Sequence, residues 1–108
     1  LLLQAGGARD AAVRQLDLLI TQMKGDAESL KLLYRARAEV EWEQGRYDNA
    51  LMDVEESLRI DATQAEAYLL RGQIYRSQGK EPQAKRDFQK AQQLGLSPVE
   101  IHTINNNN

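Results

Sequence analysis

The chain has 108 residues, a formal net charge of −2 and a sequence pI of about 5.4. This length fits one domain, and this charge argues against broad nucleic-acid or membrane binding. A hydrophobic content of 42% and a charged content of 28% are ordinary for a globular protein and argue against wholesale disorder. The absence of cysteine excludes disulfides, thiolate metal ligands and cysteine nucleophiles, and His102 is the only histidine. The composition points away from an enzyme and predicts no metal or other cofactor.

The sequence predicts neither a membrane span nor a targeting segment. The longest apolar runs cover residues 1–3 and 16–20, and both are far shorter than the roughly 18 residues that a spanning helix needs. The chain opens on three leucines without an initial Met, so we interpret it as a piece of a longer protein. A cytoplasmic location is favoured, and a periplasmic one stays open as an alternative.

Apolar residues recur with the period of a helix, and no stretch shows the sustained two-residue alternation of a strand. The predicted helices lie near residues 8–23, 27–43, 47–60, 64–78 and 81–94, with a short further helix starting at 97.

Residues 1–30 are expected to form a partial repeat unit. Gly7 is predicted to follow a helix that ends with residues 1–3, because the residues after Gly7 have the same spacing as those after Gly45. A Gly-Asp pair at 25–26 indicates a longer turn before the next helix.

Residues 31–64 and 65–98 form two units of a repeat of 34 residues. Their ungapped alignment gives the identical pairs Tyr34/Tyr68, Arg37/Arg71, Gln44/Gln78, Gly45/Gly79, Ala50/Ala84 and Asp53/Asp87. The glycine pair falls where a helix is expected to end. The Arg–Asp spacing of 16 residues, present twice, predicts an ion pair that links the two helices of each unit. The alternative is two solvated charges.

Capping signals mark the starts of the later helices. Residues 63–66, Thr-Gln-Ala-Glu, are typical of a capping box, and so are residues 97–100, Ser-Pro-Val-Glu. Pro82 fits the first turn of the last full helix. Residues 99–108 are predicted to hold the start of a capping helix and a disordered asparagine tail.

The partial unit and the two full units together resemble the tetratricopeptide repeat (TPR) family over residues 1–98. The second unit carries the family pattern as Tyr68-x2-Arg71-Gly72-x2-Tyr75 and Ala84-x3-Phe88. Arg71 stands where the family has leucine. In the first unit Ala38 replaces the family glycine, Glu41 replaces the family tyrosine, and Trp42 comes one residue later.

The resemblance implies an all-α fold in which antiparallel helix–turn–helix repeats stack as a short right-handed superhelix, a TPR-like α-solenoid. It also implies that the first helix of each unit lines a concave face. The small residues of the pattern would let the paired helices approach to roughly 8–10 Å.

This concave face is the candidate site for a partner protein or peptide. Its proposed residues are Arg35, Glu39, Trp42, Leu69, Leu70, Gln73 and Arg76. The leucines are expected to be exposed, and Trp and Arg are frequent in interface hot spots. The alternative for Trp42 is packing in place of the tyrosine missing at Glu41. The TPR subtype that grips a C-terminal carboxylate is disfavoured, because Glu39 and Gln73 stand where it uses asparagine.

Charge is divided unevenly between the units, with a net charge of −3 over residues 31–64 and of +3 over residues 65–98. Self-association of copies, head to tail, is therefore a second hypothesis. Nucleic-acid binding is not predicted, because the basic helix near 81–94 lacks interleaved aromatic residues and any nucleic-acid motif.

The leading prediction is a non-catalytic scaffold module for protein–protein interaction. The alternatives are a structural segment of a larger oligomer and an accessory domain of a larger enzyme. The sequence contains no nucleophile–base pair, metal cluster or glycine-rich phosphate loop, and His102 is expected to be an ordinary surface residue.

Overall fold

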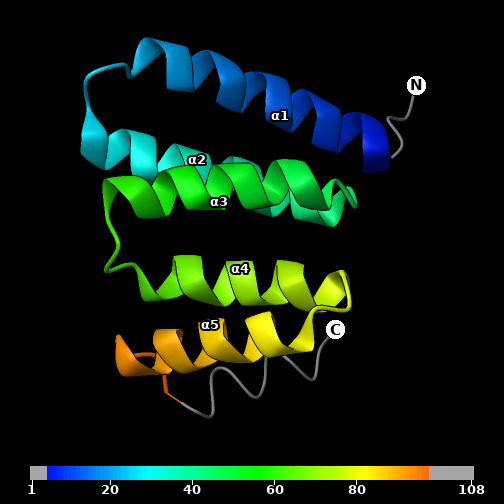
Figure 1. Ribbon diagram of the computed structural model, residues 1–108. Coiled ribbons are helices and arrows are strands. Elements are labelled where there is room, and N and C mark those ends of the chain that lie inside the picture. The colour runs from blue at the N-terminus through cyan, green and yellow to red at the C-terminus, as the bar shows by residue number, and fades with distance from the viewer. Residues whose placement is uncertain (1–4, 98–108) are drawn as a thin grey trace. The chain divides into compact units, whose positions relative to one another are not determined.

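The computed structural model describes residues 5–97 and contains only helices and turns over that range. The helices are α1 (Ala5–Gln22), α2 (Ala27–Glu43), α3 (Tyr47–Ile60), α4 (Ala65–Ser77) and α5 (Glu81–Gln93) (Figure 1). The chain divides into two compact units between Asp61 and Ala62, so that unit 1 contains α1 to α3 and unit 2 contains α4 and α5. The prediction of an all-α, TPR-like fold built from paired helices is confirmed.

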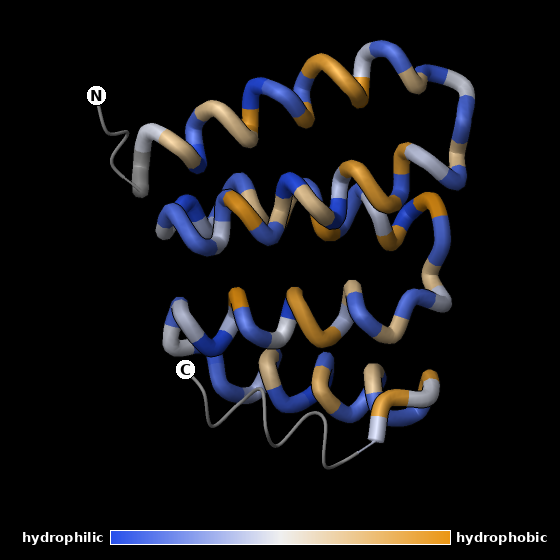
Figure 2. The backbone as a smooth tube through the Cα atoms, turned by 180° about the vertical axis from the view of Figure 1, so that it is seen from behind, coloured by the Kyte–Doolittle hydropathy of each residue, from blue (hydrophilic) through white to orange (hydrophobic). Residues whose placement is uncertain are grey.

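In unit 1, α2 and α3 form an antiparallel pair, and α1 packs against α2. The pair buries the small and branched residues of one face of each helix, among them Ala38 of α2 and Ala50, Val54 and Leu58 of α3. Polar residues interrupt the apolar ones along every helix (Figure 2), as is expected for helices with one buried face.

In unit 2, α4 and α5 form the second pair. Leu69, Ala84, Phe88 and Ala91 make its buried core, and Tyr68, Tyr75 and Leu96 pack against this core from its edges. Gly72 of α4 lies directly against the ring of Phe88, which confirms that the small residue permits a close approach of the two helices.

The turns after α2, α4 and α5 share one pattern of backbone hydrogen bonds, and each contains a glycine with positive φ. Gly45 and Gly79 have φ of 78° and 77°, which an L side chain rarely adopts. After α2, the Gly45 amide donates to the Trp42 carbonyl at 2.9 Å and the Arg46 amide donates to the Glu41 carbonyl at 2.8 Å. These two bonds define a Schellman motif, and the same bonds recur 34 residues later and once more at Gly95.

The predicted helix boundaries agree with the observed ones to within three residues, and Pro82 lies in the first turn of α5 as predicted. Two local predictions were wrong. Gly7 lies inside α1 and not in a turn before it, because the helix continues through both adjacent glycines. The N-cap of α4 is Gln64 and not Thr63, and the Gln64 side chain makes no capping hydrogen bond. The helices expected at residues 1–3 and from 97 onward fall largely outside the described residues.

Candidate interaction sites

Each unit contains a bidentate Arg–Asp pair that links its paired helices. In unit 1, Arg37 donates from Nε to Asp53 Oδ2 at 2.8 Å and from Nη2 to Asp53 Oδ1 at 2.7 Å. In unit 2, Arg71 donates from Nε to Asp87 Oδ2 at 2.8 Å and from Nη2 to Asp87 Oδ1 at 2.9 Å. The prediction from the repeated spacing is confirmed. The two carboxylates are buried, so the pairs are structural elements and not solvated charges.

An aromatic ring supports the guanidinium in both pairs. The Arg37 guanidinium lies 5.5 Å from the centroid of the Tyr34 ring, and the Arg71 guanidinium lies 5.5 Å from the centroid of the Tyr68 ring. These distances are within the range of cation–π attraction. They give a physical reason for Arg71 at the family leucine position, because the arginine stem packs on tyrosine while its head binds the next helix.

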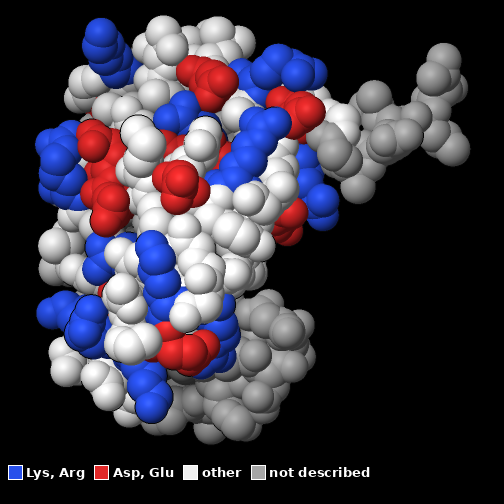
Figure 3. Space-filling view, turned by 45° about the vertical axis from the view of Figure 1, so that its right-hand side comes forward, with Lys and Arg blue, Asp and Glu red and all other residues white. Residues whose placement is uncertain are grey.

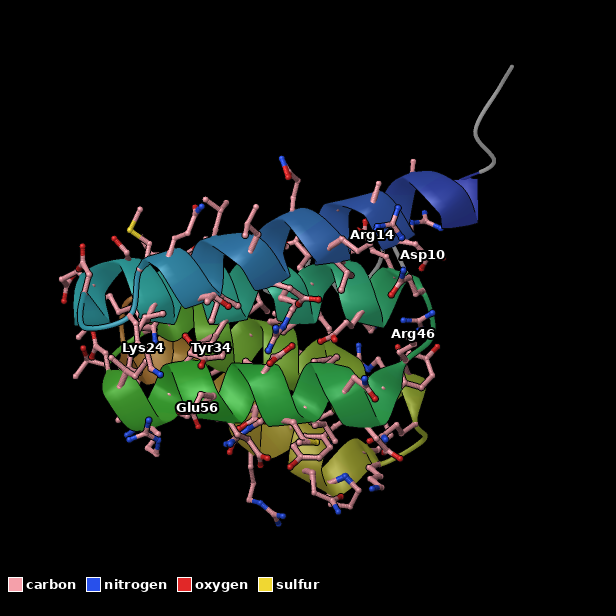
Figure 4. The ribbon with its side chains drawn as sticks, turned by 90° about the horizontal axis from the view of Figure 1, so that it is seen from above. Asp10, Arg14, Lys24, Tyr34, Arg46 and Glu56 are labelled. Atoms are coloured by element: carbon pink, nitrogen blue, oxygen red, sulfur yellow. The ribbon has the colours of Figure 1, made fainter. Side chains whose placement is uncertain are left out.

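In unit 1, the arginine of the Arg–Asp pair also binds a residue of α1. Arg37 donates a further hydrogen bond from Nη1 to Asp17 Oδ1 of α1 at 2.7 Å. Near the other end of the same face, Gln44 Nε2 donates to Asp10 Oδ1 at 2.7 Å, and Arg46 lies 3.5 Å from the same oxygen. Figure 4 shows Asp10 and Arg46 side by side where α1 begins and α2 ends. Polar contacts therefore hold α1 against the α2–α3 pair.

A cleft of about 300 Å³ lies between α1, α2 and α3, next to this network. Its lining residues are Val13, Asp17, Arg37, Glu41, Arg46, Asn49, Met52 and Asp53. Glu41 is only 6% exposed, and its Oε1 is buried without a hydrogen-bond partner. Burial raises the pKa of Glu41 to about 8; a hydrogen bond with Asp53 and the charges of Asp53 and Asp17 act in the same direction, and the charge of Arg37 opposes them.

The sequence did not predict this cleft, although one signal was present. Glu41 occupies the position at which the second unit carries Tyr75, so an ionisable side chain stands where the repeat places an aromatic one. The role of Asp17 could not be foreseen, because it comes from the partial unit, whose register was predicted from Gly7.

The predicted partner-binding residues fall on α2 of unit 1 and α4 of unit 2. On α2, Glu39 is exposed, and Arg35 and Trp42 are half-buried. On α4, Gln73 is half-buried, and Arg76 pairs with Glu81 of α5 at 3.1 Å.

The expectation that Leu69 and Leu70 are exposed is wrong, since they are 8% and 6% exposed. Leu69 belongs to the unit 2 core with Ala84, Phe88 and Ala91. A leucine next to the packing stripe of a helix is buried when the neighbouring helix covers more than one row of side chains.

Exposed apolar side chains gather where α1 ends and α2 begins. A shallow cleft of about 220 Å³ is lined by Leu19 of α1, by Met23 in the turn after α1, and by Ser29, Leu32 and Leu33 of α2. Leu18 and Leu32 are exposed over about half of their surface.

Within residues 5–97, no group of three histidine, cysteine or acidic side chains is arranged to hold a metal ion. Over the same range, none of the helices has the length and apolar character required to cross a membrane.

Comparison with protein families matches residues 3–101 to the tetratricopeptide repeat-like domain. The chain belongs to this family. TPR-like domains generally mediate protein–protein interaction and bind proteins or peptides, and repeats of this kind are typically non-catalytic. A search of curated proteins found no match.

Proposed function

We propose that the chain is a non-catalytic interaction module that binds a segment of a partner protein along α2 and α4, the first helices of its two units. The family match over residues 3–101 is the observation that carries this proposal. Both helices also keep side chains outside the buried core: Glu39 of α2 is exposed, and Arg35, Trp42, Gln73 and Arg76 are half-buried.

The contact residues that we propose combine one aromatic, several charges and an amide: Arg35, Glu39 and Trp42 on α2, and Gln73 and Arg76 on α4. Leu69 and Leu70 stay in the proposed set as buried residues that hold α4 in position. A partner with mixed charge and at least one apolar anchor suits this set, because Trp and Arg favour well-packed, partly desolvated contacts.

Peptides selected from a display library against the intact chain, and titrated by fluorescence anisotropy, test this proposal. We expect Trp42→Ala and Gln73→Arg each to weaken binding by about tenfold, the effect of removing or obstructing one hot-spot contact. Gln89→Arg on α5 is the matched control for Gln73→Arg, since Gln89 is exposed on a second helix. Equal affinity of the Gln73 and Gln89 variants would rule out the α4 contact.

Self-association is the second candidate function, and the charge distribution favours it. Lys85, Arg86 and Lys90 of α5 are exposed, and basic side chains dominate the face of unit 2 that Figure 3 presents. The acidic surplus lies in residues 31–64. Sedimentation velocity at low and high salt tests this candidate. A monomer at all concentrations in low salt would exclude it, because electrostatic association is strongest there.

A further inference from the structure

We propose that the cleft between α1, α2 and α3 of unit 1 binds the ammonium group of a lysine side chain from another protein. Glu41 is the principal acceptor. The site is separate from the proposed α2–α4 surface, because Glu41 and Glu39 are two residues apart on α2 and therefore point in nearly opposite directions.

The Oε1 atom of Glu41 lacks a hydrogen-bond donor. Glu41 is 6% exposed and its Oε1 has no partner. A buried acceptor without a donor costs free energy, and a buried carboxylate without one costs more. Asp53 and Asp17 do not share this deficit, because Arg37 donates to both. Glu41 Oε1 therefore lacks a hydrogen-bond donor, and Glu41 lines the cleft.

The charge of the cleft lining also favours a cation. Three carboxyl groups line the cleft, from Asp17 of α1, Glu41 of α2 and Asp53 of α3, together with the two guanidinium groups of Arg37 and Arg46. With Glu41 ionised, the lining has a net charge of −1. Arg37 is already bound to two carboxylates, and Arg46 faces Asp10. A single positive charge, bound in place of the Glu41 proton, makes the lining neutral.

The walls of the cleft suit the apolar stem of a lysine side chain. Val13 of α1 and Met52 of α3 line the cleft, and Met52 is 71% exposed. An apolar stem that ends in a cation matches apolar walls above a carboxylate floor. An ammonium group suits one free oxygen better than a planar guanidinium does, because it is a compact charge and its donors rotate freely. The carboxyl groups are not arranged as a metal site within the described residues.

Binding at this site is coupled to a proton. Burial raises the pKa of Glu41 to about 8, so the empty site holds Glu41 mainly in its protonated form at neutral pH. When the ammonium group binds, the carboxyl group of Glu41 releases to solvent the proton that it shares in its hydrogen bond with Asp53, and it accepts a hydrogen bond from the lysine in exchange. Affinity therefore increases as pH rises toward the pKa of Glu41, and the lysine stays charged throughout this range.

The probe for the test is Nα-acetyl-lysine methylamide, titrated into the intact chain. Methyl signals of Met52 and Val13 report the cleft, and the Met23 methyl group, in the turn after α1, is an internal control. We expect saturable shifts of Met52 and Val13 with millimolar affinity. We expect that affinity to rise by about tenfold or more between about pH 6.5 and about pH 8.5, as deprotonation of one group requires.

Glu41→Gln is the decisive variant, because it keeps the shape of the protonated side chain and removes the charge. It should weaken binding by about tenfold or more and abolish the pH dependence, whereas Glu43→Gln at an exposed position of the same helix should change neither. The norleucine analogue of the probe, which lacks the ammonium group, should not bind. The proposal is overturned by unchanged binding to the Glu41 variant, by equal binding of the norleucine analogue, or by the absence of a saturable shift. None of these results bears on the α2–α4 surface.

Discussion

A methyl group added to Gly72 of α4 would lie 2.6 Å from Cε1 of Phe88 on α5. This is well inside van der Waals contact, and a ring packed in the core has little freedom to withdraw. The equivalent positions of the first unit hold Ala38 and Val54, and both are fully buried. The two units therefore use two combinations at one helix crossing: glycine with a large ring, and alanine with a smaller branched side chain.

Gly72→Ala should lower the free energy of unfolding by up to about 2 kcal/mol. Alanine favours a helix over glycine by about 1 kcal/mol, and the overpacking penalty of about 1–3 kcal/mol exceeds this gain. Urea denaturation measures the change. The double variant Gly72→Ala/Phe88→Val recreates the pair of the first unit, so it should be more stable than the sum of its single variants predicts. Strictly additive effects of the two substitutions would contradict the explanation that Gly72 and Phe88 fit each other at the helix crossing.

Asp87→Ala should destabilise the chain by about 2–3 kcal/mol, because it leaves the partly buried Arg71 guanidinium without its carboxylate. Arg71→Leu/Asp87→Ala should recover most of this loss, since it removes both charges and restores the leucine of the TPR pattern. Thermal and urea denaturation of the wild type, Asp87→Ala, Arg71→Leu and the double variant give the coupling energy between Arg71 and Asp87. The control is Glu56→Ala, whose partner Arg59 is 70% exposed and which should cost less than about 1 kcal/mol. Equal costs at the two sites would contradict a structural role for the buried pair.

The raised pKa of Glu41 predicts a fall in stability as pH increases. The folded chain retains a proton on Glu41 up to about pH 8, whereas the unfolded chain releases it near the ordinary value of 4.5. The folded state therefore binds more protons between these values, and its stability decreases with pH over that window by up to a few kcal/mol. Glu41→Gln should flatten this slope in urea denaturation, and Glu39→Gln should preserve it. A slope unchanged by Glu41→Gln would show that the carboxyl group titrates normally.

Features that occur twice in the sequence could be predicted. The 34-residue repeat gave the helix ends at Gly45 and Gly79 and both Arg–Asp pairs, because each copy supports the other. The partial unit has no second copy, and there the preference of Gly7 for turns was overridden by continuation of α1. The second unit has no glutamate that corresponds to Glu41, because Tyr75 stands at the equivalent position. Its burial follows from the contact between α1 and the α2–α3 pair, and no local pattern encodes that contact. The burial of Leu69 depends in the same way on how widely α5 covers α4.

The proposed interaction function depends on the binding of a partner segment along α2 and α4. Amide chemical-shift mapping with an isotope-labelled chain and a selected peptide tests it most directly, because it locates the contact without a substitution. The account predicts that the largest shifts fall within residues 27–43 and 65–77, with Glu39 and Gln73 among them. Shifts confined to α3 and α5 would contradict it.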